Sequence, residues 1–223
     1  MTVRLFALAV LVALAASAST ASQTHDAAAV TAKVQARYAA IKDFEGDFVQ
    51  TYEGGVLRTK TTEGGTMSVK QPGLFRFVYT KPERKEFVSD GTNIYTYLVA
   101  DKQVIVSPAP GPGESTTPAL FLAGRADIAR DFTPGAISLP SAPGGLLTVK
   151  LEPRKPDPDY EWFALGVDPA TFQIRHLVAL DRQGGRSAFT FTNVKENRGL
   201  TDNTFRFRIP RGVDVVNHAG RQR

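Results

Sequence analysis

Alternation of side-chain character is clearest between residues 74 and 80 of this 223-residue chain. Phe75, Phe77 and Tyr79 occupy every second position there. A period of two among aromatic and β-branched residues predicts a strand with the three rings on one face. Tyr95 and Tyr97 repeat the spacing. A strand face this aromatic must be covered, either by a second layer of protein or by a ligand.

A helical period occurs earlier, between residues 26 and 43. Val30, Val34 and Ile41 lie at helical spacing, with basic residues between them. This pattern predicts an amphipathic helix, and Asp26 is placed to cap its amino terminus. We expect the helix to pack on the sheet.

Short extended segments separated by turn residues make up most of the remaining chain. Gly54-Gly55, Gly64-Gly65 and Asp90-Gly91 each have the composition of a turn. Turn signals at such short intervals predict a large antiparallel sheet of about eleven strands, the last of them at 205–208.

Residues 108–118 interrupt the strands with a loop rich in proline and glycine. Thr117 and Pro118 then predict the start of a short apolar helix over 119–123, and a second short helix is expected at 127–130. Such a helix could plug one end of a curved sheet. With no internal repeat, we expect a single domain over 22–216 and a flexible tail over 217–223.

The first 21 residues have the form of a secretory signal peptide. Arg4 gives a positive start, residues 5–16 are apolar, and small residues allow cleavage after Ala18 or Ala21. The apolar run is too short to span a bilayer, so we expect an exported, unanchored protein. The chain has no cysteine, which excludes disulfides, thiol catalysis and a lipid-modified cysteine.

The net charge of +5 does not indicate a nucleic-acid partner, because the basic residues are scattered and form no stripe for phosphates. No motif for catalysis stands out either. There is no G-x-S-x-G elbow or phosphate loop, and His25, His176 and His218 lack metal-ligand spacing. We interpret His176 as a residue of the sheet surface. Asp90 and Asp181 precede glycines and are better explained by hairpin turns, so we expect no catalytic residue, metal or cofactor.

The remaining signal is the set of large apolar side chains. On composition alone, an ordinary barrel core explains them better than a ligand cavity does. The set consists of Phe75, Phe77, Tyr79, Tyr95, Tyr97, Trp162, Phe163, Phe172, Phe189 and Phe191.

Short motifs in a fixed order resemble those of the LolA family of periplasmic carriers of outer-membrane lipoproteins. FVQ at 48–50 is similar to its F-x-Q element, and VKQPG at 69–73, followed by aromatic residues, to its K-x-P segment. SDG at 89–91 with the two following tyrosines matches a third motif, and PALFL at 118–122 stands where the family carries a lid helix. Parts of 181–214 resemble its carboxy-terminal signature. The resemblance covers nearly the whole chain after the signal peptide.

The resemblance implies an unclosed half-barrel of about eleven antiparallel strands, mainly β with some α, covered by two to three helices that form a lid. Acyl chains would lie in its interior. Where some members have an arginine that holds the lid shut, this chain has Gln71, a possible latch without charge assistance; Arg76 or Arg125 could replace it. The expected cavity residues are Phe75, Phe77, Tyr79, Tyr95, Tyr97, Trp162, Phe172, Phe189 and Phe191, and the expected lid residues are Val30, Val34, Ile41, Leu120, Phe121 and Leu122.

The implied function is that of a periplasmic chaperone, expected to be a monomer, which moves acylated lipoproteins from an inner-membrane ABC-type exporter to an outer-membrane acceptor. The sequence leaves open whether that acceptor exists. One alternative is a related half-barrel carrier or sensor of free lipid, glycolipid or envelope stress. Another is a periplasmic hydrolase with an aspartate or glutamate on the barrel rim, which no pair of carboxylates in a cavity context supports.

Overall fold

The computed structural model describes residues 26–54, 59–111 and 117–218. The predicted signal peptide, with both cleavage positions, lies outside these residues, as do the last five residues of the predicted tail. The amino-terminal half contains α1 (Ala27–Ala40), β1 (Asp43–Glu53), β2 (Lys60–Lys70), β3 (Leu74–Lys81), β4 (Lys85–Asp90), β5 (Asn93–Leu98) and β6 (Gln103–Pro108). The carboxy-terminal half contains α2 (Pro118–Leu122), α3 (Ile128–Asp131), β7 (Phe132–Ala136), β8 (Leu147–Pro153), β9 (Tyr160–Val167), β10 (Ile174–Asp181), β11 (Arg186–Glu196), the 3-10 helix η1 (Asp202–Phe205) and β12 (Asp214–Asn217).

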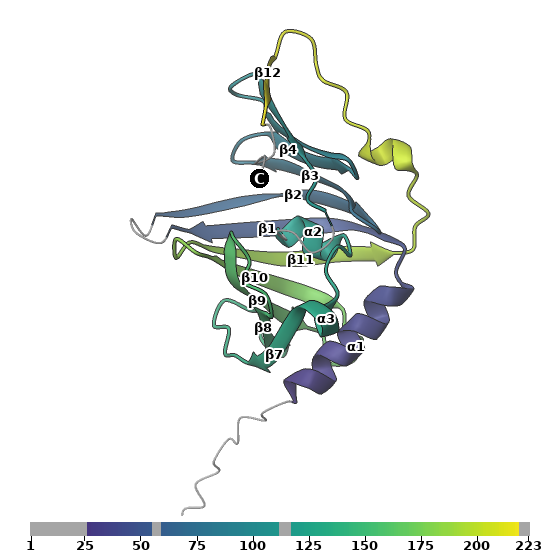
Figure 1. The fold of residues 1–223 in the computed structure, drawn as a ribbon, viewed down its shortest axis with the longest axis vertical. Helices are drawn as coiled ribbons and strands as arrows, with labels where there is room; N and C mark the ends of the chain where they lie inside the picture. Colours follow the sequence, from purple (N-terminus) through teal and green to yellow (C-terminus); the bar gives the residue numbers. More distant parts are fainter. Residues whose placement is uncertain (1–25, 55–58, 112–116, 219–223) are drawn as a thin grey trace, which may run out of the picture.

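All strands join one curved sheet, in the order β12-β6-β5-β4-β3-β2-β1-β11-β10-β9-β8-β7. Within the described residues, β12 and β7 end this order without pairing to each other, so the sheet is an unclosed barrel. Figure 1 shows α2 in front of the middle of the sheet and α1 with α3 at the β7–β8 end. The predicted half-barrel is confirmed, and the described residues contribute twelve strands to it where about eleven were expected.

The predicted aromatic strand is β3, and buried and partly exposed side chains alternate along it as expected. Phe75, Phe77 and Tyr79 are buried, while the residues between them are partly exposed. Phe77 and Tyr79 make edge contacts with Phe48 of β1, at 5.3 Å and 4.8 Å between ring centroids. Phe75 makes an edge contact with Phe77 at 6.0 Å. Edge-to-face packing of this kind stabilises the concave side of the sheet.

Gly64-Gly65 was predicted as a turn, and this prediction is wrong. Both glycines lie inside β2, which runs unbroken past them. Gly65 pairs with Phe48 on one side and with Tyr79 on the other, and a Cβ atom there would overlap the carbonyl oxygen of Val78. The glycine is therefore required for a close approach of β2 and β3.

The carboxy-terminal segment also differs from the prediction. Residues 205–208 form no strand, because Phe205 is the last residue of η1 and the next three residues have no regular structure. The helix η1 contacts β3 and β4, with Phe205 fully buried. The last strand is β12, which pairs in parallel with β6. The boundary predicted after residue 216 therefore falls inside β12, and the backbone N–H of His218 still donates to Val106.

The helix α1 begins as the sequence predicts. The Asp26 carboxylate accepts from the N–H of Ala28 at 2.9 Å and caps the helix. Val30, Val34 and the residue that ends the helix, Ile41, are buried in the main core. No helix in the described ranges is long and apolar enough to cross a bilayer.

Candidate ligand-binding cavity

A cavity of about 350 Å³ lies between α2 and the concave face of the sheet. Most of its wall is aromatic or aliphatic, with a minority of hydroxyl and amide groups, as is usual for pockets that bind apolar ligands. The lining residues are Gln50, Phe75, Phe77, Tyr79, Phe87, Ile94, Thr96, Thr117, Pro118, Ala119, Leu122, Tyr160, Ser187 and Phe189.

Four of the nine expected cavity residues line this space. They are Phe75, Phe77, Tyr79 and Phe189. Phe191 lies behind Phe189 in the core, with the two rings stacked at 6.2 Å. Phe191 therefore supports the wall without lining the cavity.

The prediction that Tyr95 and Tyr97 line the cavity is wrong. They lie on the outer face of β5, where Phe207 lies 5.2 Å from Tyr95 and 6.0 Å from Tyr97 between ring centroids. Ile94 and Thr96 line the cavity in their place. Successive residues of a strand point to opposite faces, so an error of one position moves the whole set to the other side.

Trp162 and Phe172 are also misplaced by the prediction. Trp162 packs on a separate cluster on the opposite face of β9, because its neighbour Phe163 occupies the main core. Phe172 has a positive φ of 57° in the turn before β10, and Lys33 of α1 lies 4.8 Å above its ring. Neither residue lines the cavity.

The expected lid divides into two parts. Leu122 lines the cavity together with Pro118 and Ala119, whereas Leu120 and Phe121 are buried against the rest of the core. The lid residues expected on α1, which are Val30, Val34 and Ile41, are also core residues and do not border the cavity. The element over the cavity is α2 alone among the described helices.

Gln71, the expected latch, does not bond to α2. Its Nε2 donates to the carbonyl oxygen of Tyr38 at 3.3 Å, in the last turn of α1, and its Oε1 packs against Gly124. Arg125 joins the segment after α2 to the β4–β5 turn, because its Nη2 donates to the carbonyl oxygen of Gly91 at 3.1 Å. Arg76, the other candidate, instead bonds Thr204 and Glu86 on the outer face.

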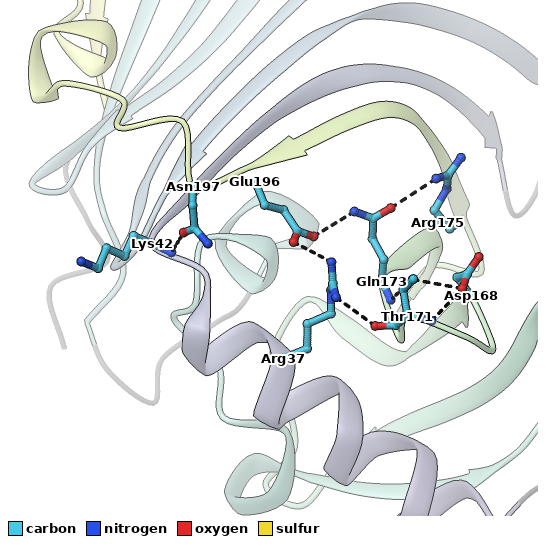
Figure 2. A network of polar contacts seen from close by, with 8 residues as sticks. All are labelled: Arg37, Lys42, Asp168, Thr171, Gln173, Arg175, Glu196 and Asn197. Atoms are coloured by element: carbon cyan, nitrogen blue, oxygen red, sulfur yellow. Dashed lines mark hydrogen bonds and ion pairs between the residues drawn. The ribbon is translucent and has the colours of Figure 1, made fainter.

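A polar network fastens α1 to the sheet (Figure 2). Arg37 forms an ion pair with Glu196 of β11 at 2.6 Å and donates to the carbonyl oxygen of Thr171 at 3.0 Å. Gln173 donates to the second oxygen of Glu196 at 2.8 Å, and the N–H of Lys42 bonds Asn197 at 2.9 Å. Because several bonds join α1 to elements far away in sequence, α1 is fastened to the sheet, although none of its residues lines the cavity.

One end of the cavity is polar. The Tyr79 hydroxyl donates to Gln50 Oε1 at 2.5 Å. Lys85 lies 4.6 Å above the Tyr79 ring and forms an ion pair with Glu63 at 2.6 Å. Burial, and secondly the Glu63 charge, raises the pKa of Tyr79 far above its ordinary value, so the phenol stays neutral. No pattern in the sequence predicted these polar neighbours of Tyr79.

His176 is not a surface residue, contrary to the sequence-based interpretation. It is 1% exposed, with Nδ1 3.0 Å from the Thr190 hydroxyl and Nε2 3.3 Å from that of Ser141. Burial lowers its pKa. Asp90 and Asp181 accept bonds from the backbone of their hairpin turns, as predicted. In the part of the chain that the structure describes, no three His, Asp or Glu side chains gather as a metal site would require.

Comparison with known proteins places the chain in a family. The family model described as "Outer membrane lipoprotein carrier protein LolA" matches residues 39–208. The chain is 28% identical over 207 residues to the outer-membrane lipoprotein carrier protein of Cupriavidus taiwanensis, covering 92% of this chain and 95% of that one. It is 32% identical over 170 residues to the protein of the same name from Nitrosospira multiformis, covering 76% and 80%.

A solved structure agrees in fold. The crystal structure of an uncharacterized conserved protein from Thermus thermophilus aligns with a TM-score of 0.51 and 17% identity, over 86% of this chain and 99% of that one. Because the family model spans most of the chain, the resemblance seen in the motifs is confirmed: this chain belongs to the LolA family of outer-membrane lipoprotein carrier proteins.

Proposed function

We propose that this chain is a periplasmic carrier that holds the acyl chains of lipoproteins in the cavity beneath α2. It takes them from an ABC-type exporter in the inner membrane and delivers them to an acceptor in the outer membrane, without catalysing a reaction. The observation that carries the proposal is the apolar cavity between α2 and the aromatic face of β3. Relatives named as outer-membrane lipoprotein carriers, matched over nearly their whole length, support it.

The energetics of the cargo explain why such a cavity is needed. Each buried CH₂ group contributes about 0.8 kcal/mol, so exposing a chain of about fifteen of them to water costs roughly 12 kcal/mol. A carrier must offer an apolar wall that replaces the membrane. The Phe75, Phe77 and Leu122 side chains provide such a wall.

Release of the cargo requires a wall that opens. The polar network holds α1, whereas hydrogen bonds from Gly73 and Arg125 join the α2 region to two hairpin turns. Thr117 caps the amino terminus of α2 by accepting from Leu120. We infer that α2 is the moving lid and that α1 stays in place.

Native mass spectrometry of the protein purified from the periplasm tests the function. We expect a co-purifying acylated lipoprotein, lost in Ile94→Glu, which places a charge on the half-buried cavity wall. Val49→Glu is the matched control, because Val49 is 50% exposed. A bound phospholipid or glycolipid in place of lipoprotein would favour a related lipid carrier or sensor. An empty protein that also fails to take up a fluorescent fatty acid would contradict both functions.

A further inference from the structure

Polar side chains gather on the concave face at one end of the cavity. Gln50 and Glu63 are directly paired across β1 and β2, and Tyr79 and Lys85 are paired across β3 and β4. Paired residues share a face of the sheet, and Gln50 and Tyr79 line the cavity, so all four side chains are on the cavity side. Ser187 of β11 also lines this end. We name these five residues the polar rim.

Gln50 has an unused donor in this rim. Its Oε1 accepts from the Tyr79 hydroxyl, which burial keeps protonated. Its Nε2 donates no hydrogen bond to any of the described residues. A side-chain amide carries two N–H donors, so among the described residues the mainly apolar cavity wall presents a donor without a partner.

Lys85 provides donors at the same place. Its Nζ lies 2.6 and 2.8 Å from the two carboxylate oxygens of Glu63 and 4.6 Å from the centroid of the Tyr79 ring. The two charged side chains are 24% and 18% exposed, so both have lost most of their contact with water. An ammonium group has three donors, and Glu63 does not use all of them. An ion pair costs desolvation at an apolar wall, and a polar ligand atom would offset part of that cost.

We propose that the polar rim binds ester carbonyl oxygens at the head of the acyl chains, with Gln50 Nε2 and Lys85 Nζ as the donors. The inference rests on the proposed carrier function and adds the part of the cargo that the polar end contacts. An ester carbonyl accepts hydrogen bonds and donates none, which matches two donors. It is attached directly to the hydrocarbon chain that Phe75 and Phe77 would enclose. The same ester-linked glycerol occurs in lipid-modified cysteine and in phospholipids.

The proposal can be tested with two lipids of equal chain length, one with ester-linked and one with ether-linked chains. The ether lipid is the comparison because it lacks the carbonyl oxygens. We expect the full chain to bind a diacylglyceryl-cysteine lipopeptide about three- to tenfold more tightly than its ether analogue. The preference should disappear in Gln50→Leu and shrink in the double variant Glu63→Gln/Lys85→Met, which removes the ion pair without leaving one charge alone. No preference in the natural protein, or an unchanged one in both variants, would overturn the proposal.

Two control variants test whether the preference for the ester lipid depends on the polar rim or is lost on any substitution in these strands. Thr51→Val changes the neighbour of Gln50 that points to the other face, and Lys60→Met removes an exposed charge from β2. Both should keep the preference, and its loss in either control would overturn the proposal. Thermal unfolding of each variant shows whether it is folded.

Two further comparisons identify the lipid class that supplies the ester. They also separate failure of the polar-rim proposal from failure of the carrier function. Ester- and ether-linked phosphatidylglycerol are compared in the same assay, and a preference confined to this pair would assign the rim to phospholipid. If the natural protein binds neither lipid of either pair, the carrier function fails. If it binds ester and ether equally well, the carrier function stands and the polar rim is refuted.

Discussion

Arg125 donates from Nη2 to the carbonyl oxygen of Gly91 at 3.1 Å, which joins the segment after α2 to the β4–β5 turn. The same guanidinium packs on Gly73, where an added Cβ atom would overlap Arg125 Nε. Gly73 in turn donates its N–H to the carbonyl oxygen of Ala123 at 2.8 Å. Two hairpin turns and the end of α2 therefore meet at one arginine.

Arg125→Gln should make α2 leave the cavity more often. A hydrogen bond from a charged donor contributes about 1.5–3 kcal/mol, so its loss should raise the dissociation rate of a bound fluorescent fatty acid about ten- to a hundredfold. Stopped-flow displacement measures this rate. Arg130→Gln is the control, because Arg130 is exposed and bonds its neighbour Asp131 within α3. Equal rates in the natural protein and in Arg125→Gln would show that this bond does not hold α2.

Gly65→Ala should destabilise the protein by at least about 2 kcal/mol, because the new Cβ atom would overlap the Val78 carbonyl oxygen. The strands β2 and β3 would have to separate at the centre of the sheet. Chemical denaturation measures the free energy of unfolding. Gly135→Ala is the matched control, since nothing lies within 4 Å of a Cβ atom there, and its free energy of unfolding should change by less than about 0.5 kcal/mol. Equal effects of the two substitutions would contradict the close approach.

The large antiparallel sheet could be predicted from the sequence because period-two patterns and turn residues are local signals, whereas the unclosed barrel was implied only by the family resemblance. Phe75, Phe77 and Tyr79 were placed correctly, since only one face of β3 is consistently buried. For β5 the same reasoning failed. Its residues are partly buried on both faces, because the outer face is covered by the distant carboxy-terminal segment, where Phe207 packs on Tyr95. No periodicity within β5 distinguishes the two faces.

The polar rim could not be found by pattern. Glu63 lies in a segment without apolar alternation, and Lys85 lies 22 residues further along. Their contact depends on the register of β2, β3 and β4, which sets Gly65 opposite Tyr79 and Tyr79 opposite Lys85. Register across three strands is a tertiary property that composition does not reveal.

Glu196→Gln should cost about 1–3 kcal/mol of stability, because it breaks a largely buried ion pair with Arg37 and leaves that guanidinium without its charge partner. Asp202→Asn is a matched carboxylate-to-amide control in the pair with Lys70. Asp202 is 74% exposed, and exposed pairs contribute little, so we expect less than about 1 kcal/mol. Urea denaturation of both variants measures the difference. If both lose the same stability, the network does not fasten α1.

His176 should make the stability depend on pH. Burial lowers its pKa in the folded state, whereas the unfolded chain titrates near the ordinary value of about 6.5. Below that pH the unfolded state binds more protons than the folded state, so acid favours unfolding. The contribution of His176 is therefore fully present above about pH 6.5 and is lost as the pH falls toward the lowered folded pKa.

The pH dependence can be isolated by replacing the histidine with a residue that does not titrate. His176→Gln keeps a polar side chain between Ser141 and Thr190, and it should flatten the fall in the free energy of unfolding between about pH 7.5 and 5. His218→Gln is the control, because His218 is exposed beyond β12 and should keep the slope of the natural protein. Equal slopes in the natural protein and in His176→Gln would mean that His176 is protonated equally in both states, and the buried neutral imidazole would be refuted.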